Sequence, residues 1–304
     1  MTKTIYSNLL KNRRYVICLL LLFFLNPIKL HSKTVIDETG RKIIIPEYPK
    51  RIISLAPSIT EIIYDLNQEH RLKGVTLFSD YPPQAKKLPV IGSYIHLDLE
   101  KIVSLRPDIC IGIHDGNPKE VISRLEKLNI PVYLLNPKDF NAVTFSLNNL
   151  GKILNCEQRS KFLINDIKSR VNDISKKVEK INSKPGIFFQ IGINPIVSAG
   201  NSTFIHELIN MAGGKNLAKG QIPYPRFSIE QVIALSPDII IIATMAREGG
   251  FDQVKAMWKK WKNINAVKNN MIFLVDSNLV NRPTYRLVEG LETLAKLIHP
   301  KLFN

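Results

Sequence analysis

The chain has 304 residues, of which 45% are hydrophobic and 22% charged, a composition that indicates a globular protein and excludes a low-complexity one. This length suits two domains better than one. The formal net charge is +16 at pH 7, but the lysines are scattered and no basic stripe carries interleaved aromatic residues, so we expect no nucleic-acid partner.

The first 32 residues are typical of a cleaved secretory signal, with basic residues before an apolar run at 16–25. That run is shorter than the roughly 20 residues of a membrane-spanning helix. We expect cleavage after Ser32 and export, which leaves a formal charge of +11, with an uncleaved anchor as the alternative. Cys18 lies inside the run rather than just after it, so no lipid anchor is expected. Cys110 and Cys156 form no CxxC pair and predict no disulfide framework.

Residues 33–138 predict an α/β lobe. Residues 33–47 alternate in polarity around a turn at Thr39-Gly40, which is typical of a hairpin. Short apolar runs then alternate with helical patterns, an order that implies parallel strands. Ser58 and Glu61 fit a capping box at the start of the first helix. Strands are expected at 51–56, 72–78, 108–113 and 131–135, and helices at 58–66, 97–105 and 118–130.

Residues 139–185 interrupt this alternation, because they contain no strand-like run. Apolar residues within 155–181 recur at helical spacing, and the pattern stops at Pro185-Gly186. We therefore predict one long amphipathic helix that joins two lobes.

Residues 186–304 predict the second α/β lobe. The expected fold class is α/β, with two Rossmann-like lobes built on parallel sheets and joined by one long helix. Because open parallel sheets bind ligands at the carboxyl ends of their strands, we expect the ligand cleft between the lobes. The second lobe is predicted to contain a strand at 186–193, a helix at 202–214 closed by Gly213-Gly214, a helix–strand unit at 228–243, a helix at 252–262, a strand at 271–276 and a helix at 285–298.

One short unit occurs in each lobe. Residues 98–113 read DLEKIVSLRPDICIGI and residues 228–243 read SIEQVIALSPDIIIIA, an ungapped match at an offset of 130 positions. The pattern predicts a helix, a turn at Pro-Asp and a buried strand in both copies. A buried core explains the shared apolar positions but not Glu100 and Glu230, whose first-turn carboxylates gain about 0.3–1 kcal/mol from the helix dipole.

Motifs for catalysis are missing from the sequence, which has no phosphate-binding loop, dinucleotide fingerprint or nucleophile elbow. The stretch HELIN at 206–210 begins like a zinc-protease helix but has Asn210 where the second histidine is needed. The six histidines are dispersed, so we expect neither a metal site nor a catalytic residue. His114 follows a predicted buried strand and is expected at the cleft, with an ordinary loop histidine as the alternative.

Aromatic residues follow the predicted strands. Phe78 and Tyr81 stand at or just after the second strand, and Tyr94 and Tyr224 each precede a repeated glutamate by six positions. Flat aromatic walls suit a large, flat, partly apolar ligand. Local packing of loop tyrosines beside prolines explains the same spacing equally well.

Six segments together resemble the periplasmic cobalamin-binding proteins of vitamin B12 importers, within the wider iron-siderophore, haem and cobalamin substrate-binding proteins. The likeness runs from about Thr34 to near the end of the chain and implies a rigid two-lobe binder, monomeric when free, without cofactor or enzymatic activity. It also implies a corrinoid ligand and an ABC permease as partner. A siderophore or haem ligand is the first alternative, and an exported hydrolase on this fold is the second. The segments are RIISLAPSITE, SDYPPQAKKLPVIGSY, LEKIVSLRPD, FFQIGINPIVSAG, MAGGKN and FSIEQVIALSPD.

The resemblance assigns aromatic walls of the cleft to Phe78, Tyr94 and Tyr224. The family has tryptophans where this chain has Tyr94 and Tyr224, and another where Ile113 stands. These departures leave open which corrinoid, or which other macrocycle, is transported.

The resemblance assigns polar ligand contacts to the loop SNLVNRPTYR, where Asn278 and Arg282 match residues that reach corrin side-chain amides. The family residue at the position of Asn278 is acidic. Asn194, in GINP, ends the first strand of the second lobe and is expected to line the cleft. Glu100 and Glu230 match two glutamates that dock onto arginines of the permease, one from each lobe, where charge-assisted pairing suits a carboxylate.

Overall fold

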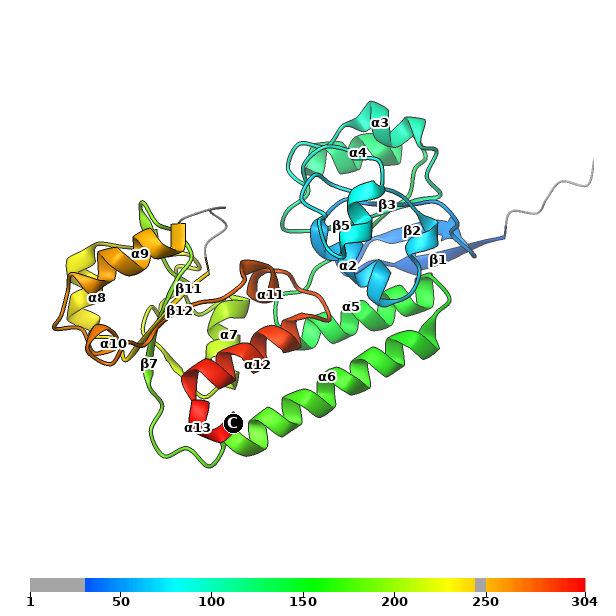
Figure 1. Cartoon of the computed structure of the whole chain (residues 1–304). Coiled ribbons are helices and arrows are strands. Elements are labelled where there is room, and N and C mark those ends of the chain that lie inside the picture. Colours follow the sequence, from blue (N-terminus) through cyan, green and yellow to red (C-terminus); the bar gives the residue numbers. More distant parts are fainter. Residues whose placement is uncertain (1–30, 244–249, 304) are drawn as a thin grey trace, which may run out of the picture.

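The computed structural model describes residues 31–243 and 250–303 and contains two α/β lobes joined by a layer of long helices (Figure 1). The predicted fold class is confirmed. The predicted signal at 1–32 lies almost wholly outside the described residues. Within the described ranges, no helix is both long and apolar enough to cross a membrane.

The N-terminal lobe begins with the predicted hairpin and continues with a parallel sheet in the order β4-β3-β5-β6. Its strands are short and apolar, and β3, β5 and β6 are almost entirely buried, as expected for strands covered on both faces. The elements are β1 Ser32–Ile36, β2 Lys42–Pro46, β3 Ile52–Ser54, α2 Pro57–Asp65, η1 Glu69–Arg71, β4 Leu72–Gly74, η2 Pro83–Lys87, α3 Leu99–Ser104, β5 Ile109–Ile113, α4 Lys119–Lys127 and β6 Val132–Leu135.

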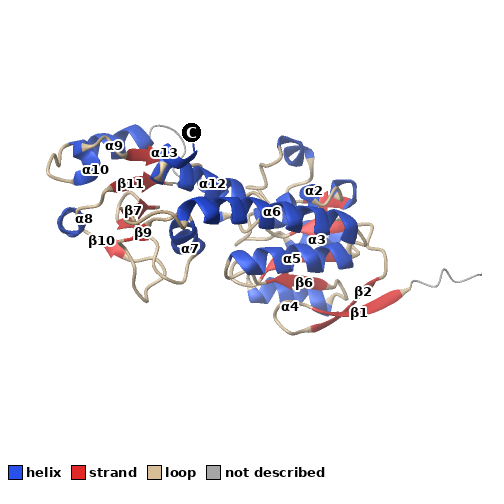
Figure 2. Ribbon diagram, turned by 90° about the horizontal axis from the view of Figure 1, so that it is seen from below, coloured by secondary structure: helices blue, strands red, loops and turns tan. Residues whose placement is uncertain are grey.

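The joining region consists of two helices, α5 Phe140–Ile153 and α6 Glu157–Val178, which pack side by side (Figure 2). The single long helix predicted for 155–181 is therefore confirmed as α6, but Phe140–Ile153 forms a second helix, α5. The turn between them contains Asn155, whose φ of 55° lies in the left-handed region that asparagine tolerates.

The C-terminal lobe repeats the sheet plan, with the parallel order β9-β7-β11-β12. The helix α7 ends as predicted at the glycine pair, because Gly213 adopts a φ of 79° and Gly214 donates its N–H to the carbonyl of Ile209. The elements are β7 Gly186–Gln190, β8 Ile196–Val197, α7 Phe204–Met211, β9 Lys215–Asn216, β10 Arg226–Phe227, α8 Ile229–Leu235, β11 Ile239–Ile242, α9 Gly250–Lys259, α10 Asn265–Lys268, β12 Ile272–Leu274, α11 Ser277–Asn281, α12 Leu287–Ile298 and α13 Pro300–Phe303.

The repeated unit folds in the same way in both lobes. Asp98 caps α3 by accepting from Lys101 N–H, and Ser228, at the matching position, caps α8 by accepting from Gln231 N–H. After each helix, Arg106 and Ser236 both take left-handed φ angles, of 47° and 44°.

The Pro-Asp pair of the unit fixes the neighbouring strand. Asp108 accepts from the N–H groups of Lys50 and Arg51 at the start of β3, with distances of 2.7 and 2.9 Å. Asp238 accepts from the N–H of Gly186 at the start of β7, at 2.8 Å. The same side chain therefore ties two adjacent parallel strands together in each lobe.

The apolar cores show how the lobes are joined. One buried cluster on the α2 face of the N-terminal sheet continues through α5, α6, α7 and α12 to the second sheet. Two smaller clusters lie on the other faces, one beneath α3 and α4 and one around Trp258. In both views α12 lies beside α6 (Figures 1 and 2), where Arg170 donates two hydrogen bonds to Glu292, of 2.7 and 2.8 Å. The lobes therefore share a core rather than meeting through a loose linker.

Two local predictions are wrong. The strand expected at 72–78 is short, ending at Gly74, after which Val75 makes an isolated bridge to Val90. The capping box of Ser58 and Glu61 does not form, because α2 begins at Pro57 after Ala56 and carries no side-chain cap. Ser58 therefore lies inside the first turn and not at the N-cap position, which Ala56 occupies without a side-chain acceptor, and Glu61 is used elsewhere.

Candidate functional site

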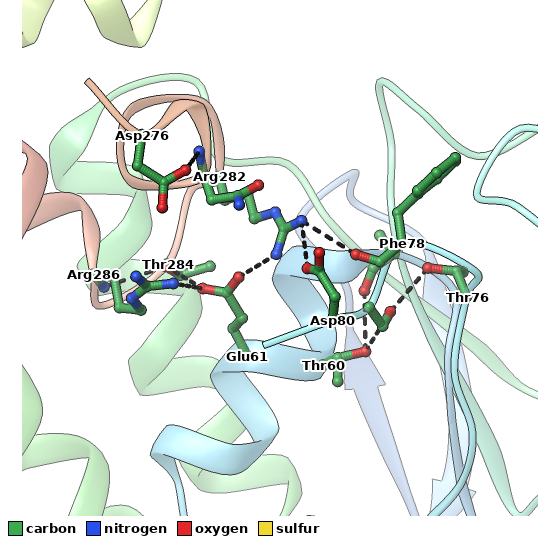
Figure 3. A network of polar contacts seen from close by, with 12 residues as sticks. Thr60, Glu61, Thr76, Phe78, Asp80, Asp276, Arg282, Thr284 and Arg286 are labelled. Carbon is green, nitrogen blue, oxygen red and sulfur yellow. Dashed lines mark hydrogen bonds and ion pairs between the residues drawn. The ribbon is translucent and has the colours of Figure 1, made fainter. Parts of the chain in front are cut away.

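The two lobes meet at a polar network around Glu61 and Arg282 (Figure 3). Glu61 lies on α2 of the N-terminal lobe, with no exposed side-chain surface, and Arg282 follows α11 of the C-terminal lobe. The Glu61 Oε1 accepts from Arg282 Nη1 at 2.6 Å, and Glu61 Oε2 accepts from Thr284 Oγ1 at 3.2 Å. These contacts join residues more than 200 positions apart in the chain.

Arg282 also binds the loop that follows β4. Its Nη2 donates to Asp80 Oδ1 at 3.0 Å and to the carbonyl oxygen of Phe78 at 3.1 Å. The Arg282 side chain is 14% exposed, and its guanidinium binds two carboxylates of the opposite lobe. Charge-assisted bonds of this kind are the stronger hydrogen bonds in proteins.

Arg286 forms the second cationic part of the junction. Its guanidinium carbon lies 3.6 Å from the ring centroid of Tyr81, and its Nη1 lies 3.8 Å from Glu61 Oε2. A looser ion pair of 3.6 Å connects Nε to Glu289. Two arginines of the C-terminal segment therefore surround one glutamate of α2.

A chain of buried hydroxyls supports the loop that carries Phe78 and Asp80. Thr60, next to Glu61 on α2, donates to Ser79 Oγ at 2.9 Å, and Ser79 Oγ lies 2.9 Å from Thr76 Oγ1. Ser54 Oγ lies 2.8 Å from Thr60 Oγ1 and donates to the carbonyl of Ala56. Buried hydroxyls that satisfy one another rigidify the segment that holds them.

Two carboxyl groups on α2 have shifted pKa values. Burial raises the pKa of Glu61, against the lowering effect of Arg282 and Arg286. Burial, together with the charge of Glu61, raises the pKa of Asp65 to about 7. Glu61 and Asp65 are four positions apart and so lie on one face of α2, which is turned toward the C-terminal segment.

Each lobe has an exposed aromatic residue near Arg282 or its neighbour Asn281. Phe78 is 41% exposed, and its ring points away from the network (Figure 3). In the other lobe, Tyr224 is 58% exposed and lines a depression of about 150 Å³, together with Asn281, the residue before Arg282. The remaining lining residues are Ile191, Thr203, Phe204, Ile205 and Val280. Phe78 and Tyr224 therefore lie next to the 281–282 segment, one in each lobe.

The other residues of the N-terminal lobe predicted at the cleft are placed differently. Tyr94 and Ile113 are partly buried and pack against the shared core. His114 lines a separate depression of about 210 Å³ with Arg41 of the hairpin and residues of α4, none of which belongs to the Arg282 network. Its imidazole Nε2 lies 3.6 Å from Asp115.

The two predicted asparagines lie in the C-terminal lobe. Asn278 is partly buried in the first turn of α11, where its N–H donates to Asp276 Oδ1 at 2.9 Å. Asn194 is exposed in the turn between β7 and β8, before the cis peptide bond to Pro195. Their predicted contacts with a ligand, and those of Phe78, Tyr94, Ile113, His114, Tyr224 and Arg282, stay predictions.

The repeated glutamates are both exposed in first helical turns, Glu100 on α3 and Glu230 on α8. The pKa of Glu230 is lowered by hydrogen bonds from its own backbone N–H and from Ser228. Figure 1 shows the two helices on opposite lobes, far from the joining layer. Helix capping in each copy is performed by Asp98 and Ser228, so neither glutamate is needed for it.

Sequence reasoning missed the residues that bind Arg282. Glu61 was interpreted as a local cap, and Asp80, Thr284 and Arg286 were not considered. The available signal was the pair Glu61 and Asp65, two carboxylates four positions apart on a largely buried helix with no other charged residue. Residues 31–243 and 250–303 contain no group of three or more His, Cys, Asp or Glu arranged to hold a metal ion.

Comparisons with known proteins show which family and which relatives this chain resembles. The family profile described as "Periplasmic binding protein" matches residues 52–279. An uncharacterized ABC transporter substrate-binding lipoprotein of Bacillus subtilis is 32% identical, covering 89% of this chain and 87% of its own. A vitamin B12-binding protein of Vibrio campbellii is 31% identical, covering 80% of this chain and 86% of its own.

One similar protein of known structure binds a different kind of ligand. A periplasmic heme binding protein from Pseudomonas aeruginosa superposes with a TM-score of 0.75 at 29% identity, covering 83% of this chain and 93% of that chain. Its similarity to this chain is close to that of the B12-binding relative, so overall likeness does not select between the two ligands.

Proposed function

The chain belongs to the periplasmic binding protein family, and from this premise we propose that it captures a corrinoid between its lobes and delivers it to the permease of an ABC importer. The family consists of substrate-binding proteins without enzymatic activity. Export to the periplasm and a monomeric free state are parts of the same proposal. The named relative from Bacillus subtilis is a lipoprotein, whereas the position of Cys18 in this chain favours a cleaved signal without a lipid anchor.

The observation that carries this proposal is the pair of exposed aromatic residues, Phe78 and Tyr224, which come from different lobes and each lie next to the polar 281–282 segment. A corrinoid is large and flat, with an apolar face and a fringe of side-chain amides. Aromatic rings provide flat apolar contact, and a few fixed polar groups then set orientation. The vitamin B12-binding relatives support the same ligand class.

Titration calorimetry tests the ligand. Cyanocobalamin and cobinamide are each added to the protein beginning at Lys33, and haemin and a ferric siderophore are added in parallel. We expect saturable binding of at least one corrinoid. Tight binding of haemin or of the siderophore, with no heat from either corrinoid, would select the alternative that the Pseudomonas aeruginosa structure suggests.

Docking to the permease is assigned to Glu100 and Glu230. Both carboxylates are exposed, one lies on each lobe, and the local structure gives neither a capping role. Charge-assisted pairing with arginines of the permease is the interaction that such carboxylates suit. Two contacts on separate lobes would align the site over the translocation pathway.

A charge reversal at both positions, Glu100→Lys with Glu230→Lys, tests this docking. Stimulation of the permease ATPase in proteoliposomes is expected to be lost, because repulsion replaces attraction at each contact, while ligand affinity stays unchanged. The matched control is Glu120→Lys, which reverses an exposed charge on α4 outside the repeated unit. Undiminished stimulation by the double variant would return both glutamates to a purely local role.

A further inference from the structure

Arg282 contacts the backbone of Phe78 and follows Asn281 of the depression that Tyr224 lines, yet two acidic side chains already engage it. Glu61 binds Nη1 at 2.6 Å and Asp80 binds Nη2 at 3.0 Å. The carboxylates come from two separate segments of the N-terminal lobe, α2 and the loop after β4. Across residues 278–289, the junction adds Arg286 and Glu289, which are themselves paired at 3.6 Å.

Stability alone does not account for this arrangement. Burying an ion pair removes water from both charges, and replacement of such a pair by apolar side chains is often neutral or stabilising. The surrounding core is apolar and continuous on this side of the sheet. A buried Glu61 facing Arg282 across the lobe junction therefore calls for a role in the site itself.

The pairing of Arg282 with Glu61 and Asp80 changes the charge that a ligand meets at this guanidinium. A free guanidinium attracts carboxylates, whereas a guanidinium between two carboxylates has no net positive charge to offer. Three of the five N–H donors of Arg282 are engaged by Glu61, Asp80 and the Phe78 carbonyl, and the others remain for a ligand. A neutral acceptor such as an amide carbonyl can still bind it. A ligand carboxylate brought to the same position would lie beside Glu61 and Asp80, and like charges placed together at an interface are unfavourable.

We propose that Glu61 and Asp80 are specificity-determining residues that select ligands with uncharged, amide-bearing edges over ligands whose edges carry carboxylates. This inference rests on the proposed function, because it concerns the same site. It uses repulsion against the wrong ligand as well as attraction to the right one. Glu61 acts through Arg282 as a positioning residue, and Asp80 acts at the solvent side, where its side chain is 29% exposed.

The test compares two probes that differ at one group, cyanocobalamin and the derivative in which one side-chain amide is hydrolysed to a carboxylate. Calorimetry gives the ratio of their dissociation constants for the wild type, Asp80→Asn, Glu61→Gln and the control Glu120→Gln. We expect the wild type and the control to bind the amide form roughly tenfold or more tightly. Both site variants are expected to reduce that ratio several-fold.

Asp80→Asn keeps the proposal testable if Glu61→Gln fails to fold, because Asp80 is partly exposed, and melting temperatures report folding for each variant. An unchanged ratio in folded Asp80→Asn protein would overturn the inference. If the wild type binds haemin and neither corrinoid, the proposed function fails separately. Haemin, which carries two propionates, is then the probe, and the inference stands only if the site variants bind haemin more tightly than the wild type does.

Discussion

The two lobes are built on the same plan, but they contribute different chemistry where they meet. Sheet order, helix caps and the aspartate of the Pro-Asp turn recur at matching positions. At the junction, α2 supplies the buried Glu61 for an ion pair with Arg282. Its counterpart α7 supplies Glu207, which accepts from the N–H of Phe140 at the start of α5. Features shared by the lobes fold each lobe, whereas unshared polar residues mark the site.

Removal of Glu61 should have the largest effect on stability, because it breaks the ion pair with Arg282, which has no counterpart in the other lobe. Glu61→Ala leaves Arg282 with one of its carboxylates gone, and loss of one partner of a buried ion pair costs about 3–5 kcal/mol. Urea unfolding of the variant and the wild type measures the difference. The control Glu120→Ala removes an exposed partner of Arg124 and should cost about 0–1 kcal/mol. Equal losses in the two variants would deny Glu61 its role at the junction.

The pH dependence of stability sharpens the same contrast through Asp65, which faces Glu61, Arg159, Arg286 and Glu289. Its pKa is raised from 3.8 to about 7, so the folded state holds the proton more tightly than the unfolded chain. The resulting stability is complete below about pH 4 and is lost as the pH rises through about 7. The raised pKa of Glu61 acts in the same direction.

Asp65→Asn should therefore flatten this dependence. At 1.36 kcal/mol per pKa unit, the free energy of unfolding of the wild type should fall between pH 4 and pH 8 by up to about 4 kcal/mol relative to the variant. Urea unfolding at several pH values checks it. Parallel pH profiles for the two proteins would show that Asp65 titrates normally. The equivalent face of α7 has no such carboxylate pair, so we expect no matching pH dependence from the C-terminal lobe.

Removal of the aspartate that the two lobes share should have the smallest effect on stability, and the effect should be similar in both lobes. Asp108→Ala and Asp238→Ala each remove a carboxylate that accepts from the first N–H groups of a neighbouring strand. Each should destabilise the protein by about 1–3 kcal/mol, the cost of leaving partly buried donors unsatisfied. Thermal unfolding of both variants measures this, and a large inequality between them would mean that the repeat has diverged in structural role.

Much of the fold was predictable because its determinants are local. The repeated unit, the hairpin and the end of α7 at Gly213 follow from patterns within a few residues of each feature. The second joining helix was missed although its sequence carries two helical signals. Buried apolar residues recur at helical spacing, at Phe140, Val143, Leu147, Leu150 and Ile153. The N-cap Asp139 accepts from Ala142 N–H.

The candidate site was less predictable because its partners are distant. Glu61 has the spacing of a local capping box, and its true partners stand 221 and 223 positions away. Arg282 was predicted from the resemblance, but the two carboxylates that bind it come from elements whose relative placement only the folded chain sets. His114 follows a buried strand as expected, yet the hairpin and α4 surround it in a depression apart from Arg282.

The absorption spectrum of the protein, purified from its native host without added ligand, tests the central claim most directly. A corrinoid held between the lobes is coloured and would co-purify. We expect a corrinoid spectrum that disappears when the protein is unfolded and dialysed. The spectrum of haem or of a ferric chelate in its place would contradict it.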